Sequence, residues 1–310
     1  MTVEFISAEI EERLDWLSAV DAIVKGHEAP KAQLTDSFLY RGPDTFLNRA
    51  AWIEGMGALV KTVTVFPDNP AAGLPVVNGS VSLYSDADGR LEALADFHLL
   101  TKWKTAADSL LAARCLARPD SRKITLVGAG GVARNMYDAY RTIFPQAEFT
   151  VWARRSEAAE HFAHALENTR AQSDLERAVS QADIICTATM SKKPLVKGEW
   201  LKPGQHLDLI GAFRPDMREV DDIALRRAAL FVDSRETVLD HIGELKIPLS
   251  EGVIDRNHVI SDYYGIASGV FSRPDDQAIT ICKNGGGAHL DLMISRYILD
   301  QWVRQKEFCP

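Results

Sequence analysis

Short apolar runs and stretches of helical periodicity alternate through the middle and the C-terminal part of the chain. Clusters of Ile, Leu, Val or Phe stand at 124–127, 149–152, 182–189, 206–211 and 229–233. Between them, apolar residues recur at the three- to four-residue spacing of amphipathic helices. Strands that alternate with helices pair in parallel, because each helix carries the chain back across the sheet. The pattern predicts an α/β fold with a Rossmann-type, doubly wound parallel sheet.

The chain before Pro119 has a different pattern, in which strand-like runs follow one another without intervening helices. The expected elements are a helix over 7–24 with Ser7 as its N-cap, a hairpin over 37–47 with a turn at 41–44, strands over 59–66 and 76–84, and a helix over 101–118 capped by Thr101. Pro119 and Asp120 then mark a plausible domain boundary. A mixed α+β domain is therefore expected ahead of the parallel sheet.

A glycine-rich turn joins the first parallel strand to the helix after it. Gly128 would permit the tight turn, Gly130 would let the backbone approach a pyrophosphate, and Ala133 would let the helix pack closely on its strand. The N–H groups at the helix start, around Gly131 and Val132, would hold the phosphates. A turn of purely structural purpose is the alternative, but strand, helix and second strand in this order favour a dinucleotide site.

The residues after the second strand bear on the choice of nucleotide. NAD sites usually place a carboxylate there, about 20 residues beyond the glycines, to bind the ribose hydroxyls. This chain has Arg154, Arg155 and Ser156 instead, and its next carboxylate is Glu157. Guanidinium groups can hold a 2′-phosphate in a bidentate manner. The pattern favours NADP(H), with NAD(H) possible and a merely solvated basic turn as the alternative.

Three lysines, Lys61 and the neighbours Lys102 and Lys104, fit a purely structural interpretation poorly. In the predicted strand 59–66, Lys61 shares a face with apolar residues, and a buried ammonium needs an anion nearby. Lys102 and Lys104 lie near the predicted start of a helix, where cations oppose the helix dipole unless an anionic ligand is present. An edge-strand lysine that reaches solvent and a solvated lysine pair are the alternatives. Together the lysines indicate a substrate that carries a carboxylate.

Composition and charge narrow the range of functions. The chain has 310 residues, 46% of them hydrophobic, which is ample for two domains. Its formal net charge of −8 and the lack of a basic run argue against nucleic acid as a partner. No run approaches the length of a membrane span, and the N-terminus lacks the features of a signal peptide, so a cytoplasmic location is expected. The four cysteines form no CxxC pair, and no metal site is expected.

Several motifs, taken in order, resemble the ornithine cyclodeaminase/mu-crystallin family over nearly the whole chain. The matching segments are 61–70, 73–75, 100–107, 127–133, 211–222, 231–234 and 283–285. The resemblance implies a homodimer with a Rossmann domain, here 119–288, that binds NAD(H) or NADP(H). It also implies a mixed substrate-binding and dimerisation domain, here 1–118 together with 289–310. Members include cyclodeaminases, imine or ketimine reductases and alanine dehydrogenases.

The resemblance assigns roles to individual residues. Lys61 matches the lysine that contacts the substrate carboxylate. It is also our candidate catalytic residue, as the donor of the proton that the imine nitrogen needs, and a water molecule is the alternative donor. Lys104 stands where the family usually has an arginine that clamps this carboxylate, so Arg49 or Arg41 could supply the missing guanidinium. We further expect Asn69 to contact the substrate, and four more residues to contact the cofactor: Thr187, Thr189, Gly211 and Asn284.

One departure from the family distinguishes its branches. Cyclodeaminases carry an aspartate two residues after the glycine that Gly211 matches, and this chain has Phe213 there. Phenylalanine can neither accept a proton nor pair with an ammonium group. The resemblance therefore favours an NAD(P)H-dependent ketimine reductase that acts on a small cyclic imino acid, such as Δ1-pyrroline-2-carboxylate or Δ1-piperideine-2-carboxylate. The alternatives are ornithine cyclodeaminase, an amino-acid dehydrogenase that works on a 2-oxo acid, and a non-catalytic protein that binds NADPH and a small ligand.

Overall fold

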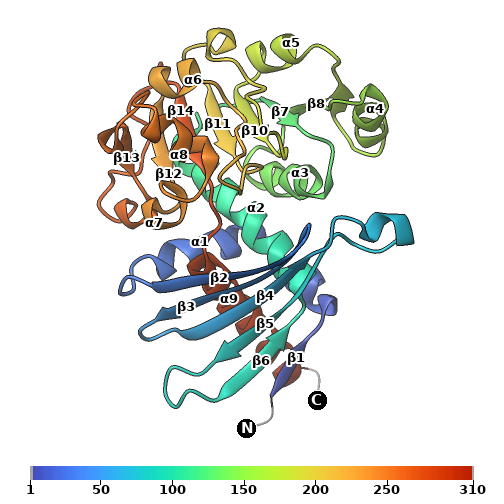
Figure 1. Cartoon of the computed structure of the whole chain (residues 1–310), viewed down its shortest axis with the longest axis vertical. Helices are drawn as coiled ribbons and strands as arrows, with labels where there is room; N and C mark the ends of the chain where they lie inside the picture. Colours follow the sequence, from blue (N-terminus) through green and yellow to red (C-terminus); the bar gives the residue numbers. More distant parts are fainter. Residues whose placement is uncertain (1–2, 309–310) are drawn as a thin grey trace. The chain divides into compact units, whose positions relative to one another are not determined.

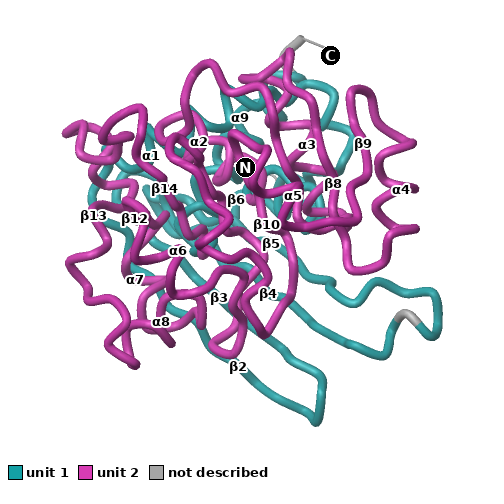
Figure 2. Tube along the Cα trace, turned by 90° about the horizontal axis from the view of Figure 1, so that it is seen from above, with its two compact units in different colours: residues 1–104, 286–310 teal, residues 105–285 magenta. Residues whose placement is uncertain are grey.

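The computed structural model describes residues 3–308, which form two compact units (Figures 1 and 2). Unit 1 contains residues up to Lys104 and from Gly286 onward, and unit 2 spans Thr105–Gly285. The sequence had predicted domain bounds after 118 and after 288. The first bound of the units lies earlier because helix α2 (Phe97–Leu116) runs without a break through the end of unit 1 into unit 2.

Unit 1 is built on a six-stranded sheet with strand order β1-β6-β5-β4-β3-β2. All neighbouring strands are antiparallel except β1 and β6, which pair in parallel. The strands are β1 (Glu4–Ile6), β2 (Gln33–Arg41), β3 (Asp44–Ile53), β4 (Gly57–Val65), β5 (Val77–Tyr84) and β6 (Leu91–Ala95), and the helices are η1 (Ala8–Arg13), α1 (Trp16–Gly26), η2 (Asn69–Ala72), the first part of α2, and α9 (Ala288–Phe308). The predicted hairpin and both predicted strands are confirmed.

Helix α9 from the C-terminus completes unit 1, although the whole of unit 2 separates it from the sheet in sequence. It packs against β3, β4 and α1. The side chains of β4 alternate between buried and partly exposed, and Leu59, Lys61 and Val63 are among the buried ones. The amphipathic pattern of β4 thus directs one face of the sheet toward the core of unit 1.

Two helix boundaries differ from the prediction. The expected helix over 7–24 is divided into η1 and α1, because Asp15 starts a new helix by accepting a hydrogen bond from the Ser18 N–H at 2.8 Å. The helix expected to start at Thr101 begins four residues earlier, where the Asp96 side chain accepts from the Leu99 N–H at 2.7 Å. Lys102 and Lys104 therefore lie beyond the first turn of α2, and the argument from an opposed helix dipole was wrong.

Unit 2 contains an eight-stranded sheet, all of whose strands pair in parallel, with order β13-β12-β14-β11-β10-β7-β8-β9. The strands are β7 (Lys123–Val127), β8 (Glu148–Trp152), β9 (Thr169–Ala171), β10 (Ile184–Thr187), β11 (His206–Leu209), β12 (Ala229–Val232), β13 (Val259–Ser261) and β14 (Thr280–Lys283), and the helices are α3 (Gly131–Ile143), α4 (Ser156–His164), α5 (Leu175–Ser180), α6 (Asp222–Arg227), α7 (Arg235–Val238) and α8 (Gly243–Ser250), with short turns η3 (Gly198–Trp200), η4 (Arg256–His258) and η5 (Tyr263–Gly265). The doubly wound α/β prediction is confirmed.

The strand order of unit 2 places a topological switch point between β7 and β10. From β7 the chain proceeds to β8 and β9 on one side, then returns to β10 on the other. In open α/β sheets, ligands bind outside the carboxyl ends of the strands at such a point. An apolar cluster around Val127, Ile185, Leu207 and Ile281 forms part of the core beneath it.

Residues 3–308 include no helix with both the length and the apolar character that a membrane span requires. The same residues contain no cluster of His, Cys, Asp or Glu suited to hold a metal ion. Cys115, Cys186 and Cys282 are free thiols, and Cys309 lies outside the described residues.

Candidate functional site

Three polar side chains of unit 1 form a row across neighbouring strands. In the strand register, Asp36 of β2 lies opposite Arg49 of β3, and Arg49 lies opposite Lys61 of β4. Residues that are directly opposite in a sheet point to the same face, so all three lie on the side of Lys61. Strand β4 lies inside the sheet, between β3 and β5, so the alternative of an edge-strand lysine is wrong.

Lys61 is buried and paired with a residue that sequence reasoning missed. Its Nζ donates to Oδ1 of Asp291 at 2.9 Å, and the side chain is 6% exposed. Burial lowers the pKa of Lys61 to about 8, although the Asp291 carboxylate opposes this shift, while Lys104 and Arg49 add to it. Burial alone would raise the pKa of Asp291, but the positive charges of Lys61, Lys104 and Arg49 lower it. The pair gives unit 1 an ammonium group that can release a proton near neutral pH.

Lys104 and Arg49 meet at a common backbone acceptor. The Arg49 Nη1 donates to the Gly286 carbonyl at 2.8 Å, and the Lys104 Nζ donates to the same oxygen at 3.4 Å. Arg49 also pairs with Asp36 at the sheet edge, at 2.8 Å. Lys61 interacts electrostatically with both Lys104 and Arg49, and Asp291 is the buried counter-ion that interacts with all three. Cations that cluster at a site shielded from water favour the binding of an anion there.

Three other residues considered for substrate binding make local contacts. Lys102 pairs with Glu11 at 2.7 Å, and Arg41 pairs with Asp44 at 2.8 Å across the hairpin turn. Arg49, rather than Arg41, is therefore the guanidinium that joins Lys61 and Lys104. Asn69 donates from its side-chain amide to the Pro75 carbonyl at 2.7 Å, a bond that closes the loop between β4 and β5.

In unit 2, the glycine-rich turn has the form that a pyrophosphate needs. Gly128 has φ +128°, and a Cβ there would stand 2.7 Å from the Ala188 carbonyl oxygen. Gly130 is the N-cap of α3 without a side-chain cap, and both Gly130 and Gly131 have open space where a Cβ would be. Ala133 is fully buried behind them, while Val132 is exposed. The uncapped N–H groups of the first turn and the free approach to them fit the phosphates of a dinucleotide.

The end of β8 presents two exposed guanidinium groups. Arg154, Arg155 and Ser156 are all exposed, and Arg155 is the N-cap of α4. Among the described residues, neither arginine side chain makes a hydrogen bond or an ion pair, whereas many other arginines do. Cations at the end of the second strand are available for a 2′-phosphate.

Thr189 and Gly211 lie at the ends of β10 and β11, where one buried carboxylate joins them. Oε1 of Glu219 accepts from the Thr189 N–H at 2.8 Å and from the Thr189 hydroxyl at 2.7 Å. Oε2 accepts from the N–H groups of Gly211 at 2.8 Å and of Ala212 at 3.1 Å. Glu219 is fully buried, and sequence reasoning did not single it out. Thr187, also fully buried, donates its hydroxyl to the Asp208 carbonyl at 3.5 Å.

Glu219 belongs to a larger buried set of charges. Glu244 accepts from the backbone N–H groups of Glu219 at 2.7 Å and Val220 at 3.1 Å. Burial, together with the charge of Glu219, raises the pKa of Glu244 to about 7. Burial lowers the pKa of Lys283, whose Nζ donates to the carbonyls of Leu209 at 2.7 Å and Asn284 at 2.6 Å. These groups hold the carboxyl ends of neighbouring strands in place.

Asn284, predicted to contact the cofactor, follows β14 and is buried in unit 2. Its side-chain amide donates to Oδ1 of Asp108 at 2.9 Å, and the Tyr263 hydroxyl donates to the same oxygen at 2.7 Å. The Asn284 side-chain oxygen is buried and accepts no hydrogen bond from any residue between 3 and 308. This oxygen can still accept a hydrogen bond from a ligand.

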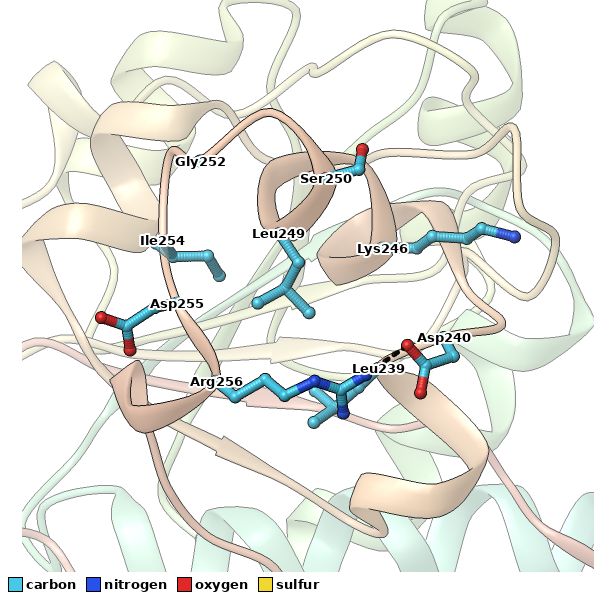
Figure 3. A pocket seen from close by; sticks show the side chains of 9 residues that line it. All are labelled: Leu239, Asp240, Lys246, Leu249, Ser250, Gly252, Ile254, Asp255 and Arg256. Carbon is cyan, nitrogen blue, oxygen red and sulfur yellow. Dashed lines mark hydrogen bonds and ion pairs between the residues drawn. The ribbon is translucent and has the colours of Figure 1, made fainter.

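A surface hollow of about 540 Å³ in unit 2 lies among other residues (Figure 3). An ion pair between Arg256 and Asp240, 2.5 Å apart, crosses one side of it. Its lining is Leu239, Asp240, Lys246, Leu249, Ser250, Gly252, Ile254, Asp255 and Arg256, and it includes none of the predicted site residues. The strand ends and the glycine turn, which form the candidate dinucleotide site, therefore lie outside this hollow.

The sequence model of one protein family matches residues 51–306 of the chain. This family is the ornithine cyclodeaminase/mu-crystallin family. The chain belongs to this family. The match covers β4, α2, the glycine turn and most of α9, so it includes parts of both units and Lys61, Lys104 and Asp291, while Asp36 and Arg49 precede it.

A similar relative by sequence is a Δ1-pyrroline-2-carboxylate reductase of Paracoccus denitrificans, 50% identical over 292 residues that cover 92% of each chain. Among solved structures, the Δ1-pyrroline-2-carboxylate reductase of Thermococcus litoralis, in complex with NADH and L-proline, matches with a TM-score of 0.90, 27% identity and coverage of 98% of both chains. An archaeal alanine dehydrogenase dimer with bound NAD matches with a TM-score of 0.90 and 28% identity, and the match covers 99% of this chain and 98% of the other. The resemblance expected from the sequence is confirmed.

Proposed function

We propose that this protein reduces a small cyclic imino acid, of the Δ1-pyrroline-2-carboxylate or Δ1-piperideine-2-carboxylate type, to the corresponding cyclic amino acid with a nicotinamide cofactor. The observation that carries this proposal is the meeting of Lys61, Lys104 and Arg49 around one buried carboxylate, that of Asp291. Similarity to pyrroline-2-carboxylate reductases supports it.

Lys104 and Arg49 hold the substrate carboxylate. Both donate to one carbonyl oxygen, that of Gly286, so their donor groups point to the same position. Arg49 supplies the planar fork that suits a carboxylate, and Lys104 supplies a second positive charge. This pairing accounts for a lysine at the position where the family usually has an arginine.

Lys61 supplies the proton that the imine nitrogen needs. A buried ammonium with a pKa of about 8 is a better proton donor near neutral pH than an ordinary lysine. Asp291 orients Lys61 and keeps it charged below that pH. The loss of this proton leaves a neutral amine, which solvent can reprotonate after each turnover.

The cofactor binds to unit 2, and NADPH is preferred to NADH. A bound NAD(P)H supplies the hydride for the imine carbon. Gly128, Gly130, Gly131, Val132 and Ala133 form the turn for the pyrophosphate. The exposed guanidinium groups after β8 hold the 2′-phosphate, and the residues after β10, β11 and β14 hold the nicotinamide half: Arg154, Arg155, Ser156, Thr187, Thr189, Gly211 and Asn284.

A substrate panel tests the proposed function directly. Purified protein with NADPH or NADH and either cyclic imino acid is expected to oxidise the cofactor, followed by its absorbance, and to release proline or pipecolate in equal amount. Ammonia release from ornithine without net cofactor use would instead identify a cyclodeaminase, which the exposed Phe213 in place of a carboxylate argues against. Tight NADPH binding without turnover of any imino or 2-oxo acid would indicate a binding protein.

We also propose that the protein forms a homodimer through the outer face of the unit 1 sheet. Leu39, Phe46 and Trp52 point away from the face that carries Lys61, and they are 66%, 38% and 59% exposed. Large apolar side chains gathered on one face of a sheet are typical of a protein interface. The dimeric archaeal alanine dehydrogenase of the same fold supports this proposal.

Charge placed on this face is expected to separate the subunits. The double variant Phe46→Glu and Trp52→Glu should elute with about half the wild-type mass in size-exclusion chromatography with light scattering. Ile260→Glu, a change at an exposed apolar residue of unit 2, is the matched control and should leave the mass unchanged. A wild-type protein that is monomeric, or a double variant that stays dimeric, would contradict the proposal.

A further inference from the structure

We infer that Glu219 is a positioning residue for the nicotinamide half of the cofactor, because its carboxylate joins the two backbone segments that follow β10 and β11. These segments lie at the carboxyl ends of the parallel strands, beside the topological switch point of unit 2. The inference rests on the proposed function and extends it to a residue with no assigned role. Glu219 follows a loop from β11 and is itself fully buried.

Each carboxylate oxygen of Glu219 accepts hydrogen bonds from one of the two segments. Oε1 takes both hydrogen-bond donors of Thr189, and Oε2 takes the N–H groups of Gly211 and Ala212. All four distances lie between 2.7 and 3.1 Å. A buried carboxylate that accepts this many hydrogen bonds is well satisfied, so the two segments are held in one fixed relation.

The close packing around Gly211 makes the arrangement specific. A Cβ at Gly211 would stand 2.2 Å from both the backbone nitrogen and the backbone oxygen of Thr189 and 2.4 Å from Oε1 of Glu219. Any side chain there would force the segments apart. The glycine that marks the family at this position is thus explained by the approach of the Thr189 backbone and the Glu219 carboxylate.

The orientation of the peptide groups shows what Glu219 achieves. In a trans peptide, the carbonyl points opposite to the N–H that follows it. Because the N–H groups of Thr189, Gly211 and Ala212 point to Glu219, the carbonyls of Ala188, Ile210 and Gly211 point away from it. The Ala188 carbonyl oxygen lies close to Gly128, at the pyrophosphate turn. These carbonyls would be available as acceptors for the ribose hydroxyls and the carboxamide NH₂ of a nicotinamide riboside.

The backbone of Glu219 is held in place by hydrogen bonds to neighbouring segments. Its backbone N–H donates to Glu244, and its carbonyl accepts from the N–H groups of Leu195 at 2.9 Å and Val196 at 3.0 Å. The Lys283 ammonium adds a favourable charge interaction from the end of β14. The carboxylate therefore has little freedom to move with a displaced loop. A change at Glu219 would instead shift the backbone at Thr189 and Gly211.

The test compares the whole cofactor with a fragment that lacks the nicotinamide half. In Glu219→Gln an amide NH₂ replaces one acceptor oxygen, so it faces N–H donors on one side and displaces that segment. We expect the Kd for NADPH, measured by fluorescence titration, to rise about 10-fold or more, since displacements near 1 Å can have effects of this size. The Kd for adenosine 2′,5′-bisphosphate should stay within about twofold of wild type, because Glu219 does not touch the turn or Arg154 and Arg155.

Two further variants separate positioning from stability. Thr189→Val removes one of the four hydrogen bonds and should weaken NADPH binding by a smaller factor than Glu219→Gln, again without effect on the fragment. Asp183→Asn is the matched control, because Asp183 accepts from the N–H groups of Arg122 at 2.8 Å and Lys123 at 2.9 Å at the opposite, amino end of the same sheet. It should lower the melting temperature and leave both Kd values unchanged.

The outcomes distinguish this inference from the proposed function. A wild-type protein that binds neither NADPH nor the fragment would overturn the proposed function. If the wild type binds both, two results would overturn the inference alone: NADPH affinity of Glu219→Gln equal to wild type, or equal losses for NADPH and the fragment. Should Glu219→Gln fail to fold, Glu219→Asp, which keeps the charge but shortens the reach of the carboxylate to both segments, gives the same comparison, and unchanged NADPH affinity there would overturn the inference.

Discussion

Replacement of Lys61 by methionine is expected to lower kcat/KM for imino-acid reduction about 1000-fold, because general acid catalysis by one side chain contributes a factor of this order. Methionine keeps the length and apolar stem of lysine and removes the ammonium group. NADPH affinity should be unchanged, because the nucleotide-binding residues belong to unit 2 and Lys61 to unit 1. Steady-state kinetics and a fluorescence titration of the cofactor measure the two quantities.

Stability must be separated from chemistry in this experiment. Lys61→Met leaves Asp291 as a buried carboxylate without its hydrogen-bonded partner, and such a loss can cost about 3 kcal/mol. The double variant Lys61→Met with Asp291→Asn removes both charges and should regain most of the melting temperature while remaining inactive. Recovery of activity in the double variant, or full activity of Lys61→Met, would show that Lys61 is not the proton donor.

The pKa of Lys61 adds a prediction for the pH profile. A proton donor must carry its proton, so log kcat/KM for reduction should fall as pH rises through about 8, the pKa that burial gives Lys61. Asp291 raises this pKa, so Asp291→Asn should move the fall to lower pH. The comparison of the two profiles cancels any titration of the substrate itself. Profiles that coincide would contradict the pairing of Lys61 with Asp291 in the working enzyme.

The second large effect is expected in cofactor choice. Replacement of both Arg154 and Arg155 by alanine should raise KM for NADPH about 100-fold and change KM for NADH little. Each guanidinium contributes a charge-assisted hydrogen bond to a phosphate, worth about 1.5–3 kcal/mol before solvent screening, and both side chains are exposed, so the lower part of this range applies. Initial rates with the two cofactors, at one fixed concentration of imino acid, measure the selectivity.

A matched arginine controls for a general loss of positive charge. Arg177 is an exposed residue of α5 in the same unit, and Arg177→Ala should leave both KM values unchanged. Because the effect is electrostatic, the NADPH preference of the wild type should also weaken as salt is raised. Equal losses of NADPH and NADH use in the double variant would place the 2′-phosphate elsewhere.

The local elements of this protein follow from its sequence because short-range physics decides them. The two-residue period around Lys61 fixes which face of β4 carries it, and apolar neighbours on that face imply burial. The glycines from Gly128 to Gly131 and the β-branched runs around them specify strand, turn and helix within about 30 residues. The family motifs, the doubly wound sheet and the arginines that replace a carboxylate after β8 are therefore properties that the sequence alone determines.

The partners of these residues were decided only by the tertiary structure. Asp291 lies 230 residues from Lys61 in the chain, and Glu219 lies 30 residues from Thr189, so no local pattern connects them. Arg49 rather than Arg41 reaches Gly286 because strand register places it opposite Lys61. Hydrogen bonds act over about 3 Å, and a pKa responds to the charges and solvent around a group, so both depend on which distant segments the fold brings together.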